Sequence, residues 1–376
     1  MAVNNQLQDL NITHQQNVEL YKRTLANRAE RIYKRGVNRL RTTLLSYVDA
    51  NDNKIPSSTV RKTIEEELLS ILDEINEEFE NTLNKEISDF TESEQRFYSS
   101  SLSKVFTGLN LVIPVTNLEN GVAFRQTKSE SINLQDGRRG RYLEELRNPG
   151  LKSKRYVRDN VRKTFALGTS IYVLSRLLFS SNQGLFNSIF RSLRVTATLL
   201  AQHATSTTRK NVYEQNNNII KGYKWVSVLD ARTSDTCQYL SERVWYYNNP
   251  DRSTLPGPIE PPAHYNCRST TAPIVMSSRE LPDSIINSQT IAVASIAAAL
   301  TGRVPQRTSY LQWLKRQPAS IQREVLGLVR YRLWKNGEIQ IESFYSKDAR
   351  YYTLEELNQL GVDIPDEYLR YVNGEE

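Results

Sequence analysis

Apolar residues recur at helical spacing over two long stretches near the N-terminus. In the first, Val18 to Val48, they return every three to four positions, and in the second, Val60 to Phe90, they do so again. This period places them on one face of an α-helix. The intervening residues 49–58 hold an Asn-Asp-Asn run and Pro56, which are typical of a turn, and Ser57 or Ser58 can cap the helix that follows. The pattern predicts two long helices joined by a turn.

The polar faces of these two helices carry opposite charge. The second helix is acidic, with eight carboxylates between Glu65 and Glu80, so an antiparallel hairpin would place acidic residues beside basic ones. The basic face is either a solvated surface or a surface for DNA phosphates. It consists of Lys22, Arg23, Arg28, Arg31, Lys34, Arg35, Arg39 and Arg41.

The middle of the chain shows less regular patterns. Residues 106–115 suit a loop or a short strand, and residues 121–140 mix Gly, Ser, Asn and Asp with little periodicity, which indicates a linker. Residues 163–211 then predict two helices with a break at 180–184. Near the end, residues 310–335 predict a helical tail interrupted at Pro318, followed by a strand at 339–344 and a short helix capped by Thr353.

These elements predict an α+β fold that is predominantly α. We expect a long N-terminal helical hairpin, central helices, and a small mixed α/β C-terminal domain with a helical tail. The expected division is a helical arm over 1–120, a basic linker over 121–162, central helices over 163–222, and the C-terminal domain over 223–376.

Composition narrows the class of protein. The chain has 376 residues, two cysteines and a formal net charge of +7. So few cysteines are typical of synthesis in a reducing cytosol, and no signal peptide or membrane anchor is expected. The excess of base favours anionic partners. The strongest candidate for non-specific binding of double-stranded DNA is a basic cluster interleaved with tyrosines, for which we select Arg138, Arg139, Arg141, Lys152, Lys154, Arg155 and Arg158.

Residues 225–273 concentrate the candidate chemistry. The first half begins with an aromatic and β-branched run from Trp225 that predicts a strand, followed by a Thr/Ser/Asp turn and a short helix at 236–239. In the second half, two prolines at 261–262 exclude a helix and hold the backbone extended before a second turn. These turns carry Cys237, His264 and Cys267. The three could bind a metal, with Asp230, Asp235 or water as fourth ligand; the cysteines could form a disulfide; or both could remain reduced.

The same segment carries a resemblance to a known family. The patterns W-V-S-x-x-D-x-R-T-S-x-x-C and P-P-x-H-x-N-C-R resemble the signature of the phage head morphogenesis family, typified by the minor head proteins of phages Mu and SPP1. An upstream helical segment around residues 194–209 and a downstream tail ending in Thr-Leu-Glu-Glu-Leu at 353–357 also resemble that family. The resemblance covers roughly the C-terminal half, so residues 223–376 are interpreted as the signature domain and its tail.

The resemblance implies a structural role. It implies a minor head protein of a tailed phage, made in the host cytoplasm and located inside the capsid at the portal vertex. Its partners would be the portal protein, major capsid or scaffold proteins and packaged DNA, with an oligomer around the vertex, and it would assist head morphogenesis and DNA ejection. The shared framework also includes Trp225, Asp230, Arg232, Thr233 and Arg268, of which Asp230, Arg232 and Arg268 are expected to form an ion-pair group joining the two halves of the signature.

One departure from the family bears on metal binding. Many members have cysteines where this chain has Ser234 and Ser269, so the cofactor is either zinc on an incomplete ligand set or none. The chain also lacks a phosphate-binding P-loop, a Gly-x-Ser-x-Gly elbow and a His-Glu-x-x-His motif. We therefore expect no enzyme. The alternative is a metal-dependent nuclease or other effector enzyme carried in the virion, with His264 in the active site.

Overall fold

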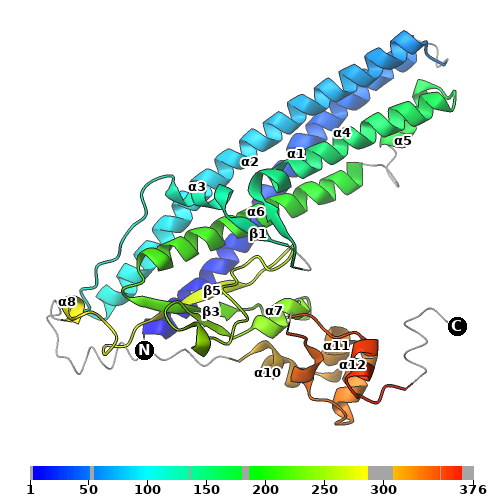
Figure 1. Ribbon diagram of the computed structural model, residues 1–376. Helices are drawn as coiled ribbons and strands as arrows, with labels where there is room; N and C mark the ends of the chain where they lie inside the picture. The colour runs from blue at the N-terminus through cyan, green and yellow to red at the C-terminus, as the bar shows by residue number, and fades with distance from the viewer. Residues whose placement is uncertain are drawn as a thin grey trace.

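A computed structural model describes residues 3–50, 55–134, 137–179, 186–286, 308–347 and 349–365. Long helices form an elongated bundle, a small sheet lies beside one end of it, and a group of short helices follows at the C-terminal side (Figure 1). The expected α+β fold, predominantly α, is confirmed. None of the helices in these ranges combines the length and apolar character needed to cross a bilayer.

The predicted hairpin is present and longer than expected. Helix α1 spans Val3–Ala50, and α2 spans Ser58–Gly108 with Ser57 as its N-cap. Both extend because their apolar stripes continue beyond the predicted bounds, through Leu7 in α1 and Leu102 in α2. Part of the segment predicted as a loop or short strand, 106–115, is therefore the last turn of α2.

Opposite charges lie side by side along the hairpin, as predicted. Arg35 contacts Glu78 at 2.5 Å, and Arg39 contacts Glu74 at 2.6 Å. These pairs are more than half exposed, so each contributes at most about 1 kcal/mol. Close packing is the stronger restraint: a Cβ added at Gly36 of α1 would lie 2.2 Å from the Ile75 side chain of α2.

The segment predicted as a basic linker is folded. It forms α3 (Val122–Ser129), the antiparallel strands β1 (Ser131–Asn133) and β2 (Arg139–Arg141), and α4 (Tyr142–Ala166). Helix α4 buries a stripe that includes Tyr142, Leu146, Val157 and Val161 against the bundle. The many charged residues between these positions hid the helical period.

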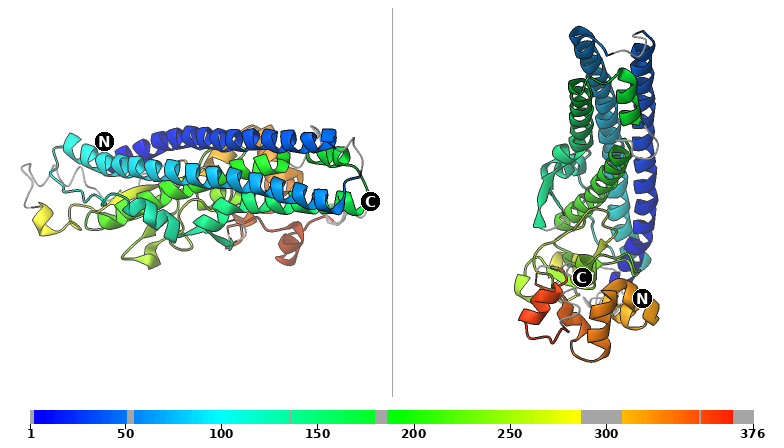
Figure 2. Two further views of the ribbon diagram at one scale, coloured as in Figure 1. Left: turned by 90° about the horizontal axis from the view of Figure 1, so that it is seen from above. Right: turned by 90° about the vertical axis from the view of Figure 1, so that its right-hand side faces the viewer.

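Two further helices match the predicted pair. Helix α5 spans Ile171–Phe179 and α6 spans Phe186–Gln215, while the predicted break at 180–184 lies outside the described residues. Helix α6 lies within the bundle and contacts α1, α2, α3 and α4 (Figure 2). Its C-terminal half is therefore buried on all sides, including polar residues such as Gln202 and Arg209.

The sheet has three antiparallel strands in the order β4-β3-β5. Strand β3 spans Ile220–Val226, β4 spans Val244–Tyr246 and β5 spans Thr270–Val275. Helix α7 (Asp235–Leu240) and a 3-10 turn, η2 (Pro250–Arg252), lie between these strands in the chain, and α8 (Asp283–Ile286) follows them. The start of α1 packs against β5, where the Asn4 Oδ1 accepts a hydrogen bond of 2.8 Å from the backbone N–H of Val275.

The C-terminal group contains α10 (Tyr310–Lys315), α11 (Ala319–Lys335), the 3-10 turn η3 (Ile341–Phe344) and α12 (Leu354–Gln359). The interruption at Pro318 and the cap at Thr353 are as predicted. The strand predicted at 339–344 is wrong. Ile341 and Phe344 are both fully buried, and a 3-10 turn places residues three apart on one face, whereas a strand would not.

The N-terminal hairpin does not stand apart as an arm. Helices α1 and α2 both pack against α6, and α1 also packs against β5 of the signature domain. The buried Lys22 of α1 donates to the backbone carbonyl of Cys267 at 2.9 Å. The described part of residues 1–120 therefore shares its core with the central helices and the signature domain.

Candidate metal centre

The first half of the signature begins at the end of β3. Trp225 is fully buried, and its indole N–H donates to the Ser227 hydroxyl, which donates to the carbonyl of Cys237. The Ser234 hydroxyl accepts from the backbone N–H of Cys237 and so caps α7. These contacts fix Cys237 in the first turn of α7, directed towards the second half of the signature.

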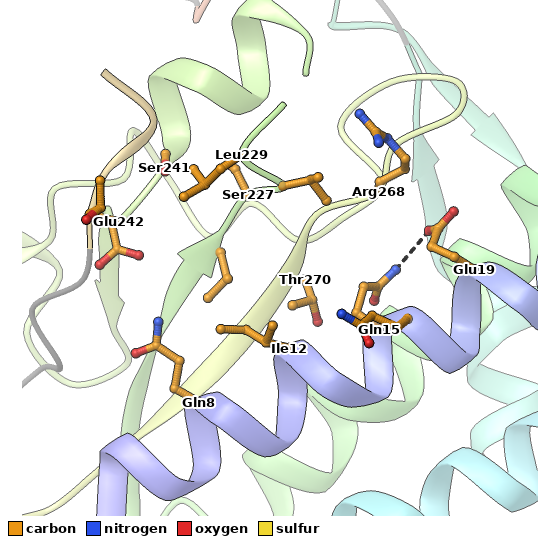
Figure 3. Close-up of a pocket in the computed structure, with 14 residues that line it drawn as sticks. Gln8, Ile12, Gln15, Glu19, Ser227, Leu229, Ser241, Glu242, Arg268 and Thr270 are labelled. Atoms are coloured by element: carbon orange, nitrogen blue, oxygen red, sulfur yellow. Dashed lines mark hydrogen bonds between the residues drawn. The ribbon is translucent and has the colours of Figure 1, made fainter. Parts of the chain in front are cut away.

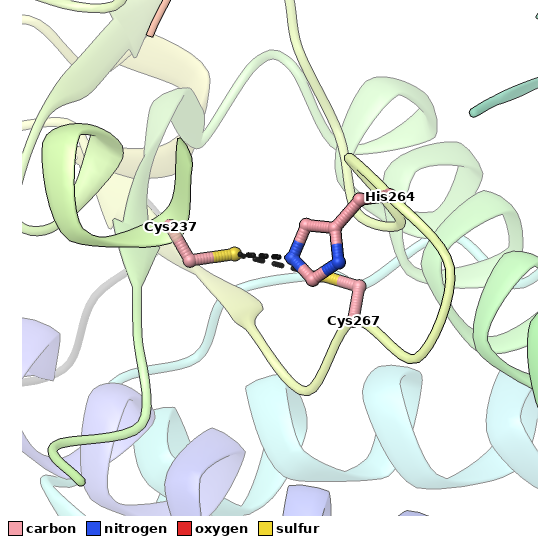
Figure 4. Close-up of side chains that lie close together, drawn as sticks. All are labelled: Cys237, His264 and Cys267. Carbon is pink, nitrogen blue, oxygen red and sulfur yellow. Dashed lines mark hydrogen bonds between the residues drawn. The ribbon is translucent and has the colours of Figure 1, made fainter. Parts of the chain in front are cut away.

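The second half brings His264 and Cys267 to the same point (Figure 4). The Cys237 Sγ lies 3.1 Å from the His264 Nε2 and 3.8 Å from the Cys267 Sγ. All three ligand atoms lie within 4.8 Å of one another, and both cysteines are buried. The predicted convergence of Cys237, His264 and Cys267 is confirmed, and the group could bind a metal ion.

The distances match metal binding better than a disulfide. Two thiolates on one tetrahedral zinc, each with a Zn–S bond of about 2.3 Å, lie about 3.8 Å apart. The separation of the two Sγ atoms here is 3.8 Å, and both thiols are free. A disulfide would require the sulfurs to approach to about 2.05 Å.

The orientation of His264 and the protonation of Cys267 suit a metal, whereas the protonation of Cys237 and of His264 opposes it. The His264 Nδ1–H donates to the Tyr265 carbonyl at 2.7 Å, which leaves the Nε2 lone pair directed at the cysteines. The hydrogen bond from Cys237, followed by His264, lowers the pKa of the Cys267 thiol well below its usual range. Thiolate and neutral imidazole are the forms that bind zinc. The hydrogen bond to Cys267 raises the pKa of the Cys237 thiol well above its usual range, and although burial alone would lower the pKa of His264, contact with Cys267 outweighs burial and raises it. Zinc would therefore have to displace a proton from Cys237 and compete with protonation of His264.

The two serines at the family's cysteine positions lie at this site. The Ser234 hydroxyl contacts the His264 Nε2 at 2.8 Å. Ser234 and Ser269 both line a cavity of about 20 Å³ together with Cys237 and His264. That cavity has room for one water molecule, which could occupy a fourth metal position.

Neither aspartate proposed as fourth ligand belongs to the group. The Asp230 carboxylate accepts two hydrogen bonds of 2.7 Å from the Arg268 guanidinium, and the arginine lowers its pKa. The Asp235 carboxylate accepts from the backbone N–H groups of Thr236 and Tyr351. Water or a serine hydroxyl is therefore the better candidate for the fourth position.

The ion-pair group joins the two signature halves through Asp230 and Arg268, as predicted, but Arg232 contributes little. Its guanidinium lies 3.8 Å from Asp230, and its side chain is 82% exposed. The Thr233 hydroxyl instead donates to the Val228 carbonyl at 2.5 Å and closes the turn. Arg232 was predicted as a third member because the spacing of charges does not reveal exposure.

The residues selected for DNA binding divide into three sets. Lys154 contacts Asp73 at 2.6 Å and Arg158 contacts Glu65 at 3.9 Å, so both face the acidic helix α2. Lys152 and Arg155 instead line hollows between α4 and α6, which Arg191 also lines. Within the described residues Lys152, Arg155 and Arg191 form no ion pair.

The third set lies at β2. Arg139 and Arg141 lie on this strand and are exposed, and Arg138 precedes it. Arg191 of α6 was not predicted as a DNA contact, because it is far in the sequence from the basic cluster at 138–158.

The other histidines lie away from the metal centre. The His14 Nε2 contacts Glu94 of α2, and the fully buried His203 contacts the Thr127 carbonyl of α3. A metal nuclease with His264 as its base would also require a second histidine or a pair of carboxylates nearby, and neither of these histidines supplies it. Comparisons of the chain with protein-family models, with curated protein sequences and with solved structures gave no match.

Proposed function

We propose that this chain is a structural minor head protein of a tailed bacteriophage, associated with the portal inside the capsid. The observation that carries the proposal is the meeting of the two signature halves. Asp230 and Cys237 belong to the first half, His264, Cys267 and Arg268 to the second, and they form one cluster through the contacts described above. The residues that carry the family resemblance thus act together in this chain.

The metal centre is suited to joining the two halves of the signature. Zinc is the metal that fits two thiolates and one imidazole, and its binding would tie β3 and α7 to the turn that precedes β5. The two cysteines are about thirty residues apart in the chain, and they meet only in the folded protein, so the free energy of zinc binding would add to the stability of the fold. Such a centre contributes stability and requires no turnover.

Contact with packaged DNA is the second part of the proposal. The hollows between α4 and α6 present Lys152, Arg155 and Arg191, beside the hydroxyls of Ser188 and Ser192. Within the described ranges these three cations form no ion pair, although Asp159 and Glu145 also line the hollows. Such a surface favours a polyanion, and contacts limited to phosphates would be independent of base sequence.

A pair of triple variants tests the DNA contact. Replacing Lys152, Arg155 and Arg191 with Gln should reduce the slope of log affinity against log salt by about 2 to 3, since each phosphate contact contributes about 0.9. The matched control replaces Lys154, Arg158 and Arg162 with Gln. It removes the same charge, but these three side chains face Asp73 and Glu65. An equal reduction in both variants would show that only net charge matters.

The portal association has a direct test. Co-expression with the portal protein of the same phage should give a complex that co-elutes in size exclusion, and mass measurement should give an integral number of copies around the portal ring. The major capsid or scaffold protein serves as the second partner to examine. Separate elution from all three would refute the head-protein proposal.

One observation favours the nuclease alternative. The cavity beside His264 would let a metal retain a water molecule, and catalytic zinc sites keep such an open position. Incubation of the zinc-loaded protein with plasmid DNA tests it. Cleavage that is lost in Cys267→Ser, while the melting temperature is retained, would replace the structural proposal with the enzymatic one.

A further inference from the structure

The C-terminal group, formed by α10, α11, η3 and α12, contacts the signature domain at α7, the helix that carries Cys237. The group has a buried apolar core of its own, so it is a compact unit that is joined to the signature domain by surface contacts. Hydrogen bonds connect it to four residues in or next to α7, which are Asp230, Asp235, Gln238 and Ser241.

Gln238, the neighbour of Cys237 in α7, is the centre of this contact. It is 4% exposed, and its Oε1 accepts hydrogen bonds of 2.6 Å from both the Tyr345 and the Tyr351 hydroxyls. Its Nε2 donates to the Thr233 carbonyl at 2.6 Å. Both lone pairs of the carboxamide oxygen are therefore used by the C-terminal group, while the nitrogen is tied to the signature.

Two backbone amides of the C-terminal group donate across the contact. The Tyr351 N–H donates to the Asp235 Oδ2 at 3.1 Å, in the first turn of α7. The Tyr310 N–H donates at 3.2 Å to the hydroxyl of Ser241, which caps the C-terminal end of α7 (Figure 3). The Tyr352 N–H, in contrast, donates at 2.9 Å to a carbonyl within the group. The first two amides lose their acceptors if the group leaves α7, and the third does not.

Ala349 extends the contact into the core around the cysteines. It is 5% exposed and belongs to the same buried cluster as Cys237 and Cys267. Its φ of 60° is left-handed, a conformation that a residue with a Cβ rarely adopts. Such a conformation persists only where its surroundings hold it, and here Tyr345 and Tyr351 pair on either side of it. Ala349 therefore covers the cysteines only while the two tyrosines are in place.

Helix α7 is thus held from two sides, by the metal centre and by the C-terminal group. Without metal, the hydrogen bond of 3.1 Å between the Cys237 Sγ and the His264 Nε2 is a weak restraint, and bonds to zinc would be a stronger one. We propose that occupancy of the metal centre controls docking of the C-terminal group, an inference that rests on the metal centre of the proposed function. Loss of the metal releases the group from α7 and exposes the tyrosines at the contact, Tyr239, Tyr345 and Tyr351. Because such coupling is reciprocal, release of the group also lets the metal leave.

Amide exchange in the full chain labelled with ¹⁵N-tyrosine tests this coupling. Zinc-loaded protein is compared with the same protein after removal of zinc by a chelator. Exchange of the Tyr310 and Tyr351 amides should be at least about tenfold faster without zinc, since each opening of the contact removes their acceptors. Exchange of the Tyr352 amide should be unchanged, because its acceptor moves with it.

Gln238→Leu tests the same contact from the side of α7 without altering a ligand. With zinc bound, it should speed exchange of the Tyr310 and Tyr351 amides by about tenfold, the effect of losing one or two hydrogen bonds. Loss of zinc to an excess of chelator should be faster by a similar factor, because Ala349 uncovers the cysteines more often. Gln359→Leu, the same change at an exposed position of α12, should alter neither rate.

Metal analysis distinguishes the possible failures. Protein that binds no zinc would refute the metal centre and this coupling together. Bound zinc with equal exchange at Tyr310 and Tyr351 in the loaded and stripped forms would overturn the coupling alone. Equal acceleration at Tyr352 would show that the group unfolds instead of undocking, and this would also overturn the proposal. The comparison of loaded and stripped protein needs no variant, so it holds even if Gln238→Leu does not fold.

Discussion

Lys22→Met tests whether the hairpin and the signature domain form one folding unit. Lys22 lies on α1 and is 3% exposed. Its ammonium donates to the Glu19 carboxylate at 2.7 Å, to the Gln202 Oε1 at 3.0 Å and to the Cys267 carbonyl at 2.9 Å. It therefore links α1, α6 and the metal centre through a single side chain.

The expected loss of stability follows from what each acceptor retains. The Gln202 Oε1 keeps a hydrogen bond from Gln15, and Glu19 is 24% exposed and can bind water. The Cys267 carbonyl loses its donor, which costs about 1 to 3 kcal/mol, and the lost charged hydrogen bonds add a similar amount. Removing the cost of burying an ammonium offsets part of this. We expect a net loss of about 2 to 3 kcal/mol.

Urea denaturation followed by two signals provides the assay. All four tryptophans lie at or beyond Trp225, so fluorescence reports the signature domain and tail, whereas far-UV circular dichroism is dominated by the long helices. Both transitions should shift together in Lys22→Met. Lys34→Met on the same helix, where the side chain is 58% exposed, should change stability by less than about 1 kcal/mol. A fluorescence transition unmoved by Lys22→Met would refute the shared core.

Three further outcomes are expected. Chelation of bound metal should lower the melting temperature, and Cys267→Ser should lower it equally and become insensitive to the chelator, as measured by differential scanning fluorimetry. Ser234→Cys should add a fourth ligand and tighten zinc binding by at least about tenfold in competition with a chromophoric chelator, because the Ser234 hydroxyl already lies 2.8 Å from the His264 Nε2. Burial lowers the pKa of His203 to about 4, so below pH 6.5 the unfolded chain binds a proton that the folded chain excludes. The free energy of unfolding should therefore fall by up to about 3 kcal/mol between pH 6.5 and 4. Urea titrations should show that His203→Gln flattens this pH dependence.

Local patterns in the sequence were sufficient for much of the fold. The stripes of α1 and α2, the Ser57 and Thr353 caps, and the interruption at Pro318 depend on neighbours within a few residues, and each was predicted. The convergence of Cys237, His264 and Cys267 was also predicted, because turns with strong local preferences carry all three.

The failures share a non-local cause. The α4 stripe is buried by α2 and α6, which its own charged composition does not reveal. Lys22 belongs to the face predicted to be solvated or bound to DNA, yet it is buried because residue 267 supplies its acceptor. Gln8 carries no sequence signal, since only the packing of α1 on the sheet turns an ordinary glutamine into a buried one.

The contact between Asn4 and Val275 can form only late in synthesis of the chain. The two residues are 271 positions apart, so at about 5 to 20 residues per second the start of α1 leaves the ribosome roughly 15 to 55 s before its strand partner is made. During that interval Val3 and Leu7 lack the sheet that finally covers them. The rate of translation, rather than the strength of any contact, therefore determines how long this apolar end is exposed to aggregation and to chaperones.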